Sequence, residues 1–415
     1  MAFLSRFRSS LGDPVLLLTV LTLTLFGAVM IFSAGQLDVP SPGVTRAWRQ
    51  QVMWLGISLV ALFVVMRVPV RWLEWVTVPL YVVSLGVLAL TLVIGTGAGT
   101  AASTKSWIRI GGFGVQPAQF ANVATVLMLA RVMGSWREQP DTVWRLWQPI
   151  MITAVPMLMI LAQPDLGTAM VFGGVLLATL FWAGTPIGIM FMLLSPMLGL
   201  ALAYMEPWIY SVYMIGLLAF LYLYRARLSE WVLVLSLNLV MGTIAWPLWN
   251  SLKPYQQARF VSFVNPESDP QGTGYHVIQS KISIGSGGLT GQGFTEGPQK
   301  RLAFIPEQHT DFIYSIIGEE LGLIGAGLVL VAYLVILWRL ARLAERTPDP
   351  FAGIVVFGIL GAWLTHVLVN VGMTLGVMPI TGIPLPFLSY GGSFLLATYM
   401  ALGVAQRVGL EHRRI

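Results

Sequence analysis

PVLLLTVLTLTLFGAVMIFSA, residues 14–34, contains no charged side chain and is long enough to cross a bilayer core as a helix, which takes about 20 residues. Further apolar blocks lie near residues 48–66, 74–95, 147–163, 167–185, 187–205, 208–224, 231–250, 312–338, 351–376 and 385–406. A weaker block at 116–133 carries Gln116, Gln119 and Asn122, so we expect it to face a polar cavity rather than lipid. The sequence therefore predicts an all-α polytopic integral membrane protein with about twelve transmembrane helices.

The composition excludes an ordinary soluble enzyme. Only 10% of the 415 residues are charged, against roughly 25% in soluble domains. Hydrophobic residues make up 56% of the chain, and the mean hydropathy is +0.77. Because the sequence has no cysteine, it excludes disulfides and thiolate metal sites. The net charge of +6 comes without a Lys/Arg-rich block, so we expect no nucleic-acid partner.

The basic residues predict how the helices are oriented. Short loops at 67–71, 224–227 and 339–346 are rich in arginine, whereas the short connections near Gln163 and Gly376 carry no Lys or Arg. Under the positive-inside rule, the arginine-rich loops are cytoplasmic, and with this orientation both termini lie in the cytoplasm. We expect the protein in the cytoplasmic (inner) membrane. The first apolar run is long enough to span, so we expect no cleavable signal peptide.

Residues 251–311 form the longest stretch without a convincing span, and the span count places this loop outside the cytoplasm. Long loops of this kind are more often functional than passive. Five glycines at 285, 287, 288, 291 and 293 leave backbone N–H groups that could approach a phosphate closely. We expect the chemistry of the protein in this loop.

Several side chains of the loop are candidates for that chemistry. Glu267 and Asp269 lie among turn-forming prolines and glycines, where a carboxylate can act as a general base, bind a metal or cap the turn. Glu307 and Asp311 have a second interpretation as helix caps, and His309 as a surface histidine. The residue types alone leave these alternatives open.

Outward-facing cations form a second group of candidates. Lys105 and Arg109 flank Trp107, which is typical either of an interfacial anchor or of a clamp for an anionic headgroup. Arg259 and Lys281 lie on the same predicted side. Lys300 does too, but we expect it to contribute less to headgroup binding.

The chain resembles the SEDS family, the shape, elongation, division and sporulation glycosyltransferases. The motifs that carry the likeness are Gln116-Pro117, Ala162–Thr168, Asn265–Pro270, Gly274–His276, Gln279–Lys281, Ile284–Gly288, Gly291–Gly293, Pro306–Phe312, Gly318–Gly322, Gly382–Pro386 and Ser389–Ser393. They occur in the family's order and extend over nearly the whole chain. The residues Gln279–Lys281 and Gly297–Gln299 are closer to the rod-elongation branch than to the division branch.

The resemblance implies a peptidoglycan glycosyltransferase that polymerises lipid II during cell elongation, together with a class B penicillin-binding protein that supplies transpeptidation. The position that matches the family's essential loop aspartate is Asp269. The substrate-binding residues we expect are Lys105, Arg109, Arg259, Lys281, Glu267, Gln279, Ser280 and His309. The departing diphosphate needs neutralisation by Lys/Arg or by a divalent cation such as Mg or Mn, and both remain open.

This chain departs from the family's pattern at two places. The family typically has ten spans, so residues 208–250 are expected to add a helix pair, which preserves the sidedness of the loop. The family's intramembrane Glu and Lys are replaced here by Gln119 and Asn122, which we expect to share a cavity with Asp165.

Two other functions are compatible with many spans. A lipid II flippase or transporter would suit broken helices such as the one at Gln163-Pro-Asp165, but it should concentrate its ionisable residues near the midplane. A non-catalytic scaffold for a penicillin-binding protein would have no need of the acidic loop. Because the acidic cluster lies in the outer loop, the sequence favours the enzyme.

Overall fold

The structure, a computed structural model, describes residues 12–39, 42–97, 105–111, 113–252, 254–264, 273–305 and 307–412. The long helices are α2 (Pro14–Ala34), α4 (Ala47–Arg67), α5 (Val70–Ile94), α6 (Pro117–Gly134), α7 (Trp147–Ala162), α8 (Leu166–Trp182), α9 (Ile187–Met205), α10 (Pro207–Tyr224), α11 (Leu228–Ser251), α15 (Ile313–Arg346), α16 (Pro350–Thr374) and α17 (Gly392–His412). The short elements are α3 (Pro42–Thr45), η2 (Val143–Leu146), α12 (Pro254–Val264), α13 (Thr273–Ser286), α14 (Pro298–Arg301), β1 (Ile108–Ile110) and β2 (Phe113–Val115).

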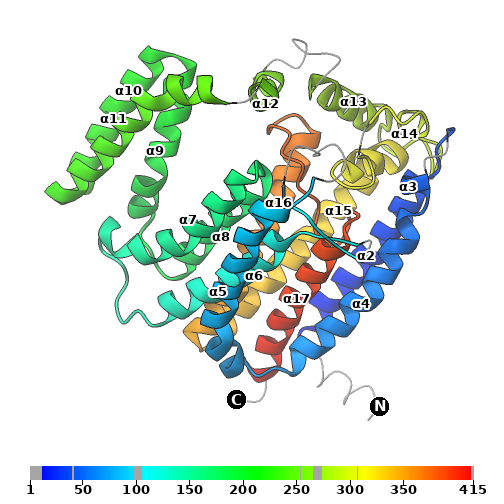
Figure 1. The fold of residues 1–415 in the computed structure, drawn as a ribbon, viewed down its shortest axis with the longest axis horizontal. Helices are drawn as coiled ribbons and strands as arrows, with labels where there is room; N and C mark the ends of the chain where they lie inside the picture. Colours follow the sequence, from blue (N-terminus) through cyan, green and yellow to red (C-terminus); the bar gives the residue numbers. More distant parts are fainter. Residues whose placement is uncertain are drawn as a thin grey trace.

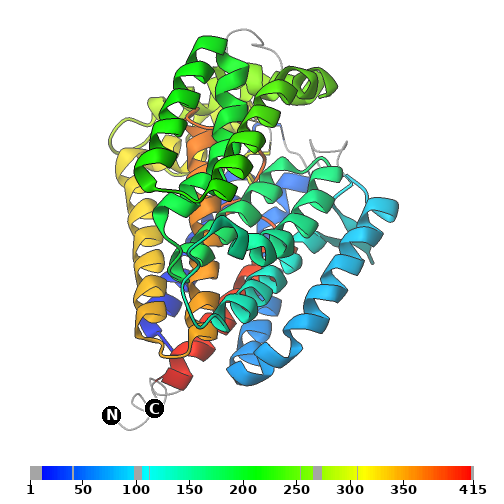
Figure 2. The ribbon, with the colours of Figure 1, turned by 90° about the vertical axis from the view of Figure 1, so that its left-hand side faces the viewer.

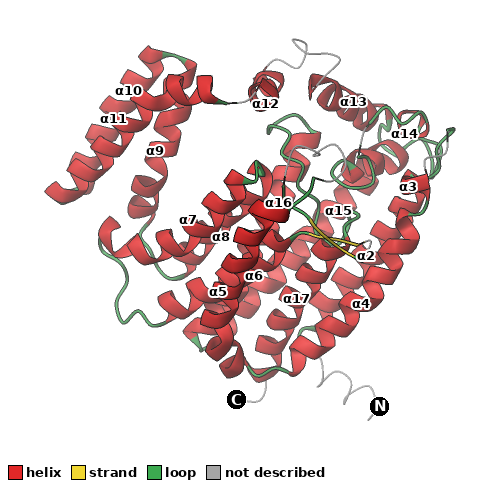
Figure 3. Cartoon of the chain, viewed as in Figure 1, coloured by secondary structure: helices red, strands yellow, loops and turns green. Residues whose placement is uncertain are grey.

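Helices dominate the fold, and the strands β1 and β2 form one small hairpin (Figure 3). Among the described residues, ten helices are long and apolar enough to cross a membrane. Helix α8 is apolar but shorter, and α6, with its polar side chains, is not one of the ten. The polytopic all-α class is confirmed, while the count of twelve spans stays a prediction.

Helices α16 and α17 form the centre of the bundle. Their most apolar windows are 78% and 83% buried, whereas that of α10 is 11% buried. Helix α16 packs against α6, α8 and α15, and α17 packs against α4 (Figures 1 and 2). Residues on these two helices can therefore be held rigidly.

The first turn of α2 and the C-terminal half of α15 are joined through Asp13. Its Oδ1 accepts a hydrogen bond of 3.0 Å from the backbone N–H of Leu16 and so caps α2. Its Oδ2 accepts one of 2.8 Å from Nε of Arg339. The start of α2 and the end of α17 lie at one end of the bundle, and α12, α13 and α14 lie at the opposite end (Figure 1). This arrangement agrees with the predicted sidedness of the loop relative to the termini.

Helices α9, α10 and α11 form a three-helix unit that stands beside the main bundle (Figure 1). Buried Asn238 on α11 donates to Oγ of Ser195 on α9 at 3.0 Å and accepts from the hydroxyl of Tyr213 on α10 at 3.0 Å. Interhelical hydrogen bonds of this kind stabilise helix association in lipid. Helices α10 and α11 occupy the predicted extra pair at 208–250, with the break that starts α10 at Glu206.

Candidate functional site

A chain of polar side chains connects α6 to α8 inside the bundle. Nε2 of Gln119 donates to Oε1 of Gln116 at 3.0 Å, and Nε2 of Gln116 donates to Oδ2 of Asp165 at 3.0 Å. Asp165 is the N-cap of α8, where its Oδ1 accepts from the backbone N–H of Thr168 at 3.0 Å. The structure thus brings together two of the three predicted cavity residues, Gln119 and Asp165, through Gln116.

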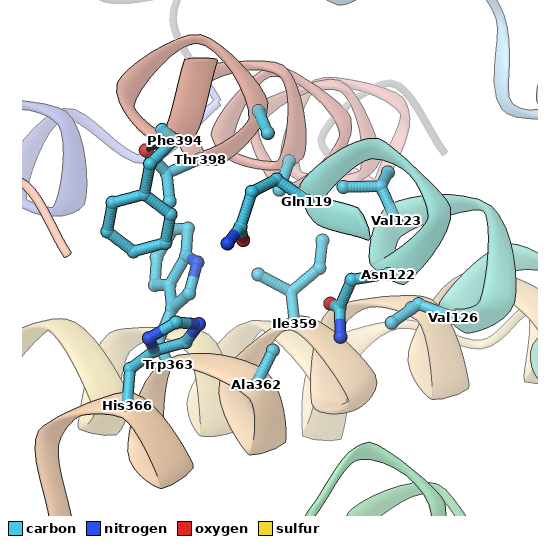
Figure 4. Close-up of a pocket in the computed structure, with 12 residues that line it drawn as sticks. Gln119, Asn122, Val123, Val126, Ile359, Ala362, Trp363, His366, Phe394 and Thr398 are labelled. Atoms are coloured by element: carbon cyan, nitrogen blue, oxygen red, sulfur yellow. Dashed lines mark hydrogen bonds between the residues drawn. The ribbon is translucent and has the colours of Figure 1, made fainter. Parts of the chain in front are cut away.

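The third predicted cavity residue, Asn122, lines the same pocket as Gln119. Both side chains point from α6 into a pocket closed by His366 on α16 and by Phe394 and Thr398 on α17 (Figure 4). The cavity volume is about 20 Å³. A cavity needs roughly 10–15 Å³ to hold one water molecule. It therefore has room for water but not for a sugar.

Two groups in this pocket have hydrogen-bonding capacity directed toward it. Nδ2 of Asn122 is buried and has no hydrogen-bond partner among the described residues. Nδ1 of His366 lies 3.0 Å from the carbonyl oxygen of Pro384, and because a carbonyl only accepts, Nδ1 carries the proton. Neutral His366 then offers Nε2 as an acceptor, so a donor and an acceptor lie in one pocket.

At the end of the bundle opposite the start of α2, α13 carries three predicted substrate-binding residues with different environments (Figure 1). Lys281 is exposed, and its Nζ lies 2.6 Å from where a Cβ on Gly376 would be, at the carboxyl end of α16. Oε1 of Gln279 is buried and finds no hydrogen-bond partner in the described part of the chain. Lys281 is therefore accessible to a ligand, and Oε1 of Gln279 has an unused capacity to accept a hydrogen bond.

Ser280 differs from this expectation because its side chain has no exposed surface. Its hydroxyl lies 2.6 Å from Oγ of Ser315 on α15 and donates to the carbonyl oxygen of Thr374 on α16 at 2.7 Å. These bonds use the hydroxyl inside the protein. Ser280 joins α13 to the bundle and does not face a substrate.

His309 lies in the loop that leads into α15. Its ring centroid is 5.4 Å from that of Tyr390, and its carbonyl oxygen accepts from the backbone N–H of Tyr390 at 3.0 Å. Burial lowers the pKa of His309, while the charge of Glu307 raises it, and the net direction is down. The imidazole is therefore neutral at neutral pH. Through its contacts with Tyr390, His309 connects this loop to the loop before α17.

The β1–β2 hairpin presents Arg109, and Lys105 lies just before it. Both side chains are exposed. Trp107 is fixed by an antiparallel bridge to Thr96, with hydrogen bonds of 2.8 and 3.1 Å between the two backbones. The cations therefore extend from an ordered support, which is compatible with either the anchor or the clamp interpretation.

The predicted phosphate nest of the glycine-rich segment is wrong for the N–H groups that the structure describes. Helix α15 is interrupted at Gly322, where φ is +63°. The N–H groups of Gln292 and Gly293 donate to the carbonyl oxygens of Glu319 and Glu320 at 2.9 and 3.1 Å. In return, the N–H groups after the break donate to the carbonyl oxygens of Gly288 and Leu289. The segment is inserted into the break of α15, and the N–H groups of Gly288, Gly291, Gln292 and Gly293 all donate to carbonyl oxygens of the protein.

Lys300, which the sequence places with the extracytoplasmic cations, is not exposed. Its side chain is fully buried, and Nζ lies 2.6 Å from Oε1 of Glu320, which is equally buried. No local sequence pattern predicts this ion pair, because the two residues lie 20 positions apart and only the packing of α14 against α15 brings them together. The sequence did contain one hint: two adjacent acidic residues, Glu319 and Glu320, follow the only lysine between Ile282 and Gly318. A pair of buried carboxylates needs a cation nearby, and Lys300 is a candidate.

Three candidates are not placed by the structure. Glu267 and Asp269 lie outside the described residues, and Arg259 lies on α12 with its side chain outside them. Within the described part of the chain, no group of three or more His, Asp or Glu residues could hold a metal ion. The Mg or Mn expectation, which depends on the loop carboxylates, therefore stays a prediction.

The comparison with known proteins agrees with this architecture. Residues 14–215 and 197–414 match the family described as "Cell cycle protein", which comprises FtsW, RodA and SpoVE. The chain belongs to this family. The overlap of the two matched ranges falls on α9 and on the first half of α10, which is one helix of the pair that the sequence marks as an addition.

Relatives of the family match over almost their entire length. The peptidoglycan glycosyltransferase RodA of Treponema pallidum (strain Nichols) is 35% identical over 426 residues, which cover 95% of this chain and 97% of the relative. The peptidoglycan glycosyltransferase MrdB of Escherichia coli (strain K12) is 30% identical and covers 97% of this chain and 94% of its own. Stage V sporulation protein E of Bacillus subtilis (strain 168) is 34% identical, with 97% and 98% covered.

Solved structures of the family share the fold. A chain of the structure described as "Structural coordination of polymerization and crosslinking by a peptidoglycan synthase complex" superposes with a TM-score of 0.71 at 30% identity, covering 97% of this chain and 98% of the other. Rod shape determining protein RodA of Thermus thermophilus superposes with a TM-score of 0.61 at 26% identity, covering 97% and 96%.

Proposed function

We propose that this protein is a peptidoglycan glycosyltransferase that polymerises lipid II at the outer face of the cytoplasmic membrane during cell elongation. The observation that carries the proposal is the 35% identity to a RodA peptidoglycan glycosyltransferase over 95% of the chain. The fold supports it, because α12, α13 and α14 gather at the end of the bundle opposite the start of α2 and the end of α17 (Figure 1). We place that end outside and the termini in the cytoplasm.

In the proposed reaction, Asp269 accepts the proton of the 4-hydroxyl of the acceptor GlcNAc. The hydroxyl oxygen then attacks the anomeric carbon of the donor MurNAc, and the bond from that carbon to the undecaprenyl diphosphate oxygen breaks. The α linkage of the donor becomes a β-1,4 linkage, which is an inversion. General-base assistance of this kind contributes about 10²- to 10⁴-fold in rate.

The leaving diphosphate carries negative charge that the site must neutralise. We assign this role to the outer cations Lys105, Arg109, Arg259 and Lys281, or to a divalent cation bound near Asp269. The exposed positions of Lys105, Arg109 and Lys281 support the assignment. Charged donors that meet a developing anion are among the strongest electrostatic contributions to catalysis.

A class B penicillin-binding protein is the partner that we propose for the crosslinking step. The similar solved chain belongs to a complex described by both polymerization and crosslinking, and this supports a partner of that kind for the present chain. Such a partner would receive the new glycan strand on the outer face.

The rival function is transport of lipid II across the membrane. The polar pocket between α6, α16 and α17 would be the natural route, but its free space fits water rather than a disaccharide. The deciding experiment measures lipid II polymerisation by the purified protein, alone and with its partner, with lipid II translocation measured in parallel vesicles. Glycan chains without translocation support the enzyme, and translocation without chains supports the transporter.

A further inference from the structure

Two adjacent carboxylates on α15 hold the outer elements of the protein. Glu319 is fully buried and accepts three hydrogen bonds: from Oγ of Ser283 on α13 at 3.0 Å, and from the backbone N–H groups of Gln299 and Lys300 on α14 at 2.7 and 3.3 Å. The last two bonds satisfy donors at the start of α14. One carboxylate therefore fixes α13 and α14 in the same place.

Glu320 extends this attachment to α2. Its carboxylate accepts from Oγ of Ser33 on α2 at 2.5 and 2.7 Å and from Nζ of Lys300 at 2.6 Å. Nζ of Lys300 also donates to Oγ of Ser33 at 3.2 Å. Among the ion pairs of the described residues, this is the one whose two side chains are both fully buried.

A buried ion pair is a poor source of stability, because desolvation of the charges offsets their attraction, and apolar replacements are often neutral. In some proteins a buried polar or charged group instead specifies one arrangement of the elements around it. Here the arrangement fixes the register of α14 and α13 against α15 and α2.

One of the fixed elements, α13, follows the proposed base in the sequence. Helix α13 begins at Thr273, four residues after Asp269 in the sequence. Ser283, near its other end, is bonded to Glu319, and the segment after it is inserted into the break of α15 at Gly322. Helix α13 is therefore attached at one end and continues into the catalytic loop at the other.

We propose that Lys300, Glu319 and Glu320 are positioning residues for glycan polymerisation, which act by holding α13 and α14, since α13 is the helix that follows Asp269 in the sequence. This inference rests on the proposed function of Asp269. The three residues touch no substrate. A displacement of about 1 Å at a reacting group can lower a rate about 100-fold.

The test uses paired neutral variants, because removal of one buried charge alone leaves the other unpaired and can prevent folding. Lys300→Met combined with Glu320→Gln removes the buried pair. The control is Asp13→Asn combined with Arg339→Gln, which removes an ion pair between the N-cap of α2 and α15 at the opposite end of the bundle. Both proteins are purified at full length, and melting temperature, lipid II polymerisation and backbone amide exchange are measured.

We expect comparable melting temperatures for the two double variants but different kinetics. In the Lys300/Glu320 variant, kcat should fall about 10- to 100-fold with apparent KM for lipid II within twofold, and amides of residues 273–305 should exchange faster. The Asp13/Arg339 variant should keep kcat within twofold and unchanged exchange in this region. Equal kcat in the two variants, or slow exchange over residues 273–305 in both, would overturn the inference.

The same experiment separates this inference from the proposed function. A wild-type protein that forms no polymer would refute the proposed function, and the amide exchange would then still decide whether the buried pair anchors α13 and α14. An active wild type with unaltered exchange in the Lys300/Glu320 variant would refute only the positioning role. Glu319→Gln adds an independent check, because glutamine keeps only one acceptor oxygen and so cannot accept from Gln299 on one side and from Ser283 and Lys300 on the other, and faster exchange is expected there as well.

Discussion

Nε2 of Gln116, which precedes α6, donates a hydrogen bond of 3.0 Å to Oδ2 of Asp165, the N-cap of α8. Together with the hydrogen bonds from the backbone N–H and the hydroxyl of Thr168, this bond holds the carboxylate of Asp165 at the start of α8. Gln119 continues the network one turn along α6. Gln119 and Asn122 are the two positions at which the resemblance to the SEDS family implies a Glu and a Lys.

The first prediction concerns that replacement. Gln119→Glu alone and Asn122→Lys alone should each lower stability by about 3–5 kcal/mol, because each buries an unpaired charge in the same pocket. Gln119→Glu should be worse, since Asp165 is two hydrogen bonds away. The double variant should recover much of the loss, because positions three apart on a helix share a face.

A double-mutant cycle on melting temperature and polymerisation rate checks this prediction. Gln119→Asn is the control for size, because it shortens the side chain without adding charge. Strictly additive losses would show that the two positions do not interact and that the shared pocket has no electrostatic consequence.

The second prediction concerns the outer cations. Lys281→Met, Lys105→Met and Arg109→Gln should raise the apparent KM for lipid II about 10-fold or lower kcat/KM by that factor, since a charge-assisted hydrogen bond contributes about 1.5–3 kcal/mol. Arg301→Gln is the matched control: Arg301 is on the same face, but its Nε already donates to Asp38 at 3.0 Å.

Small and equal effects at all four positions would favour the interfacial-anchor interpretation of Lys105 and Arg109. Steady-state kinetics at two ionic strengths add a second measure, because screening should weaken the contribution of exposed cations more than any effect on packing.

The third prediction separates a structural serine from a substrate-binding one. Ser280→Ala should lower the free energy of unfolding by about 1–3 kcal/mol, because it removes the hydroxyl that bonds Thr374 and Ser315 inside the protein. Apparent KM for lipid II should stay within twofold. A large rise in KM with unchanged melting temperature would return Ser280 to the substrate site.

The fourth prediction is a pH dependence. The pKa of His309 is held below its usual 6.5 by burial, so between that value and its folded pKa the unfolded chain binds a proton that the folded protein does not. Stability should therefore fall as the pH drops below 6.5. Melting temperatures from pH 7.5 to 5 should decline less steeply in His309→Gln than in the wild type. Identical slopes would mean that the imidazole is protonated without penalty.

Local patterns predicted the helices well, because runs of apolar residues are a local signal. The boundary at Glu206 and the pair α10 and α11 follow from the sequence alone. The same signal hides the interruption of α15, since the apolar run at residues 312–338 looks continuous. At Gly322 the helix is broken, and the N–H groups of Leu323 and Ile324 donate to carbonyl oxygens of the glycine-rich segment instead. Long-range exchange of this kind leaves no periodicity.

The site was predictable in chemistry more than in geometry. Residue types identified the polar face of α6 that Gln119 and Asn122 present to one pocket. The role of Lys300 could not be found in this way, because Ser33 lies 267 positions away and Glu320 lies 20 positions away on another helix. A lysine in an outer loop looks exposed until the fold places carboxylates against it.

The most direct test of the account is the polymerisation rate of Asp269→Asn, measured with purified lipid II beside the wild type and Glu267→Gln. We expect Asp269→Asn to lose about 10²- to 10⁴-fold in rate while its expression and melting temperature remain near wild type, and Glu267→Gln to lose less. Robust chain growth by Asp269→Asn, or an inactive Glu267→Gln beside an active Asp269→Asn, would contradict the assignment of the catalytic base.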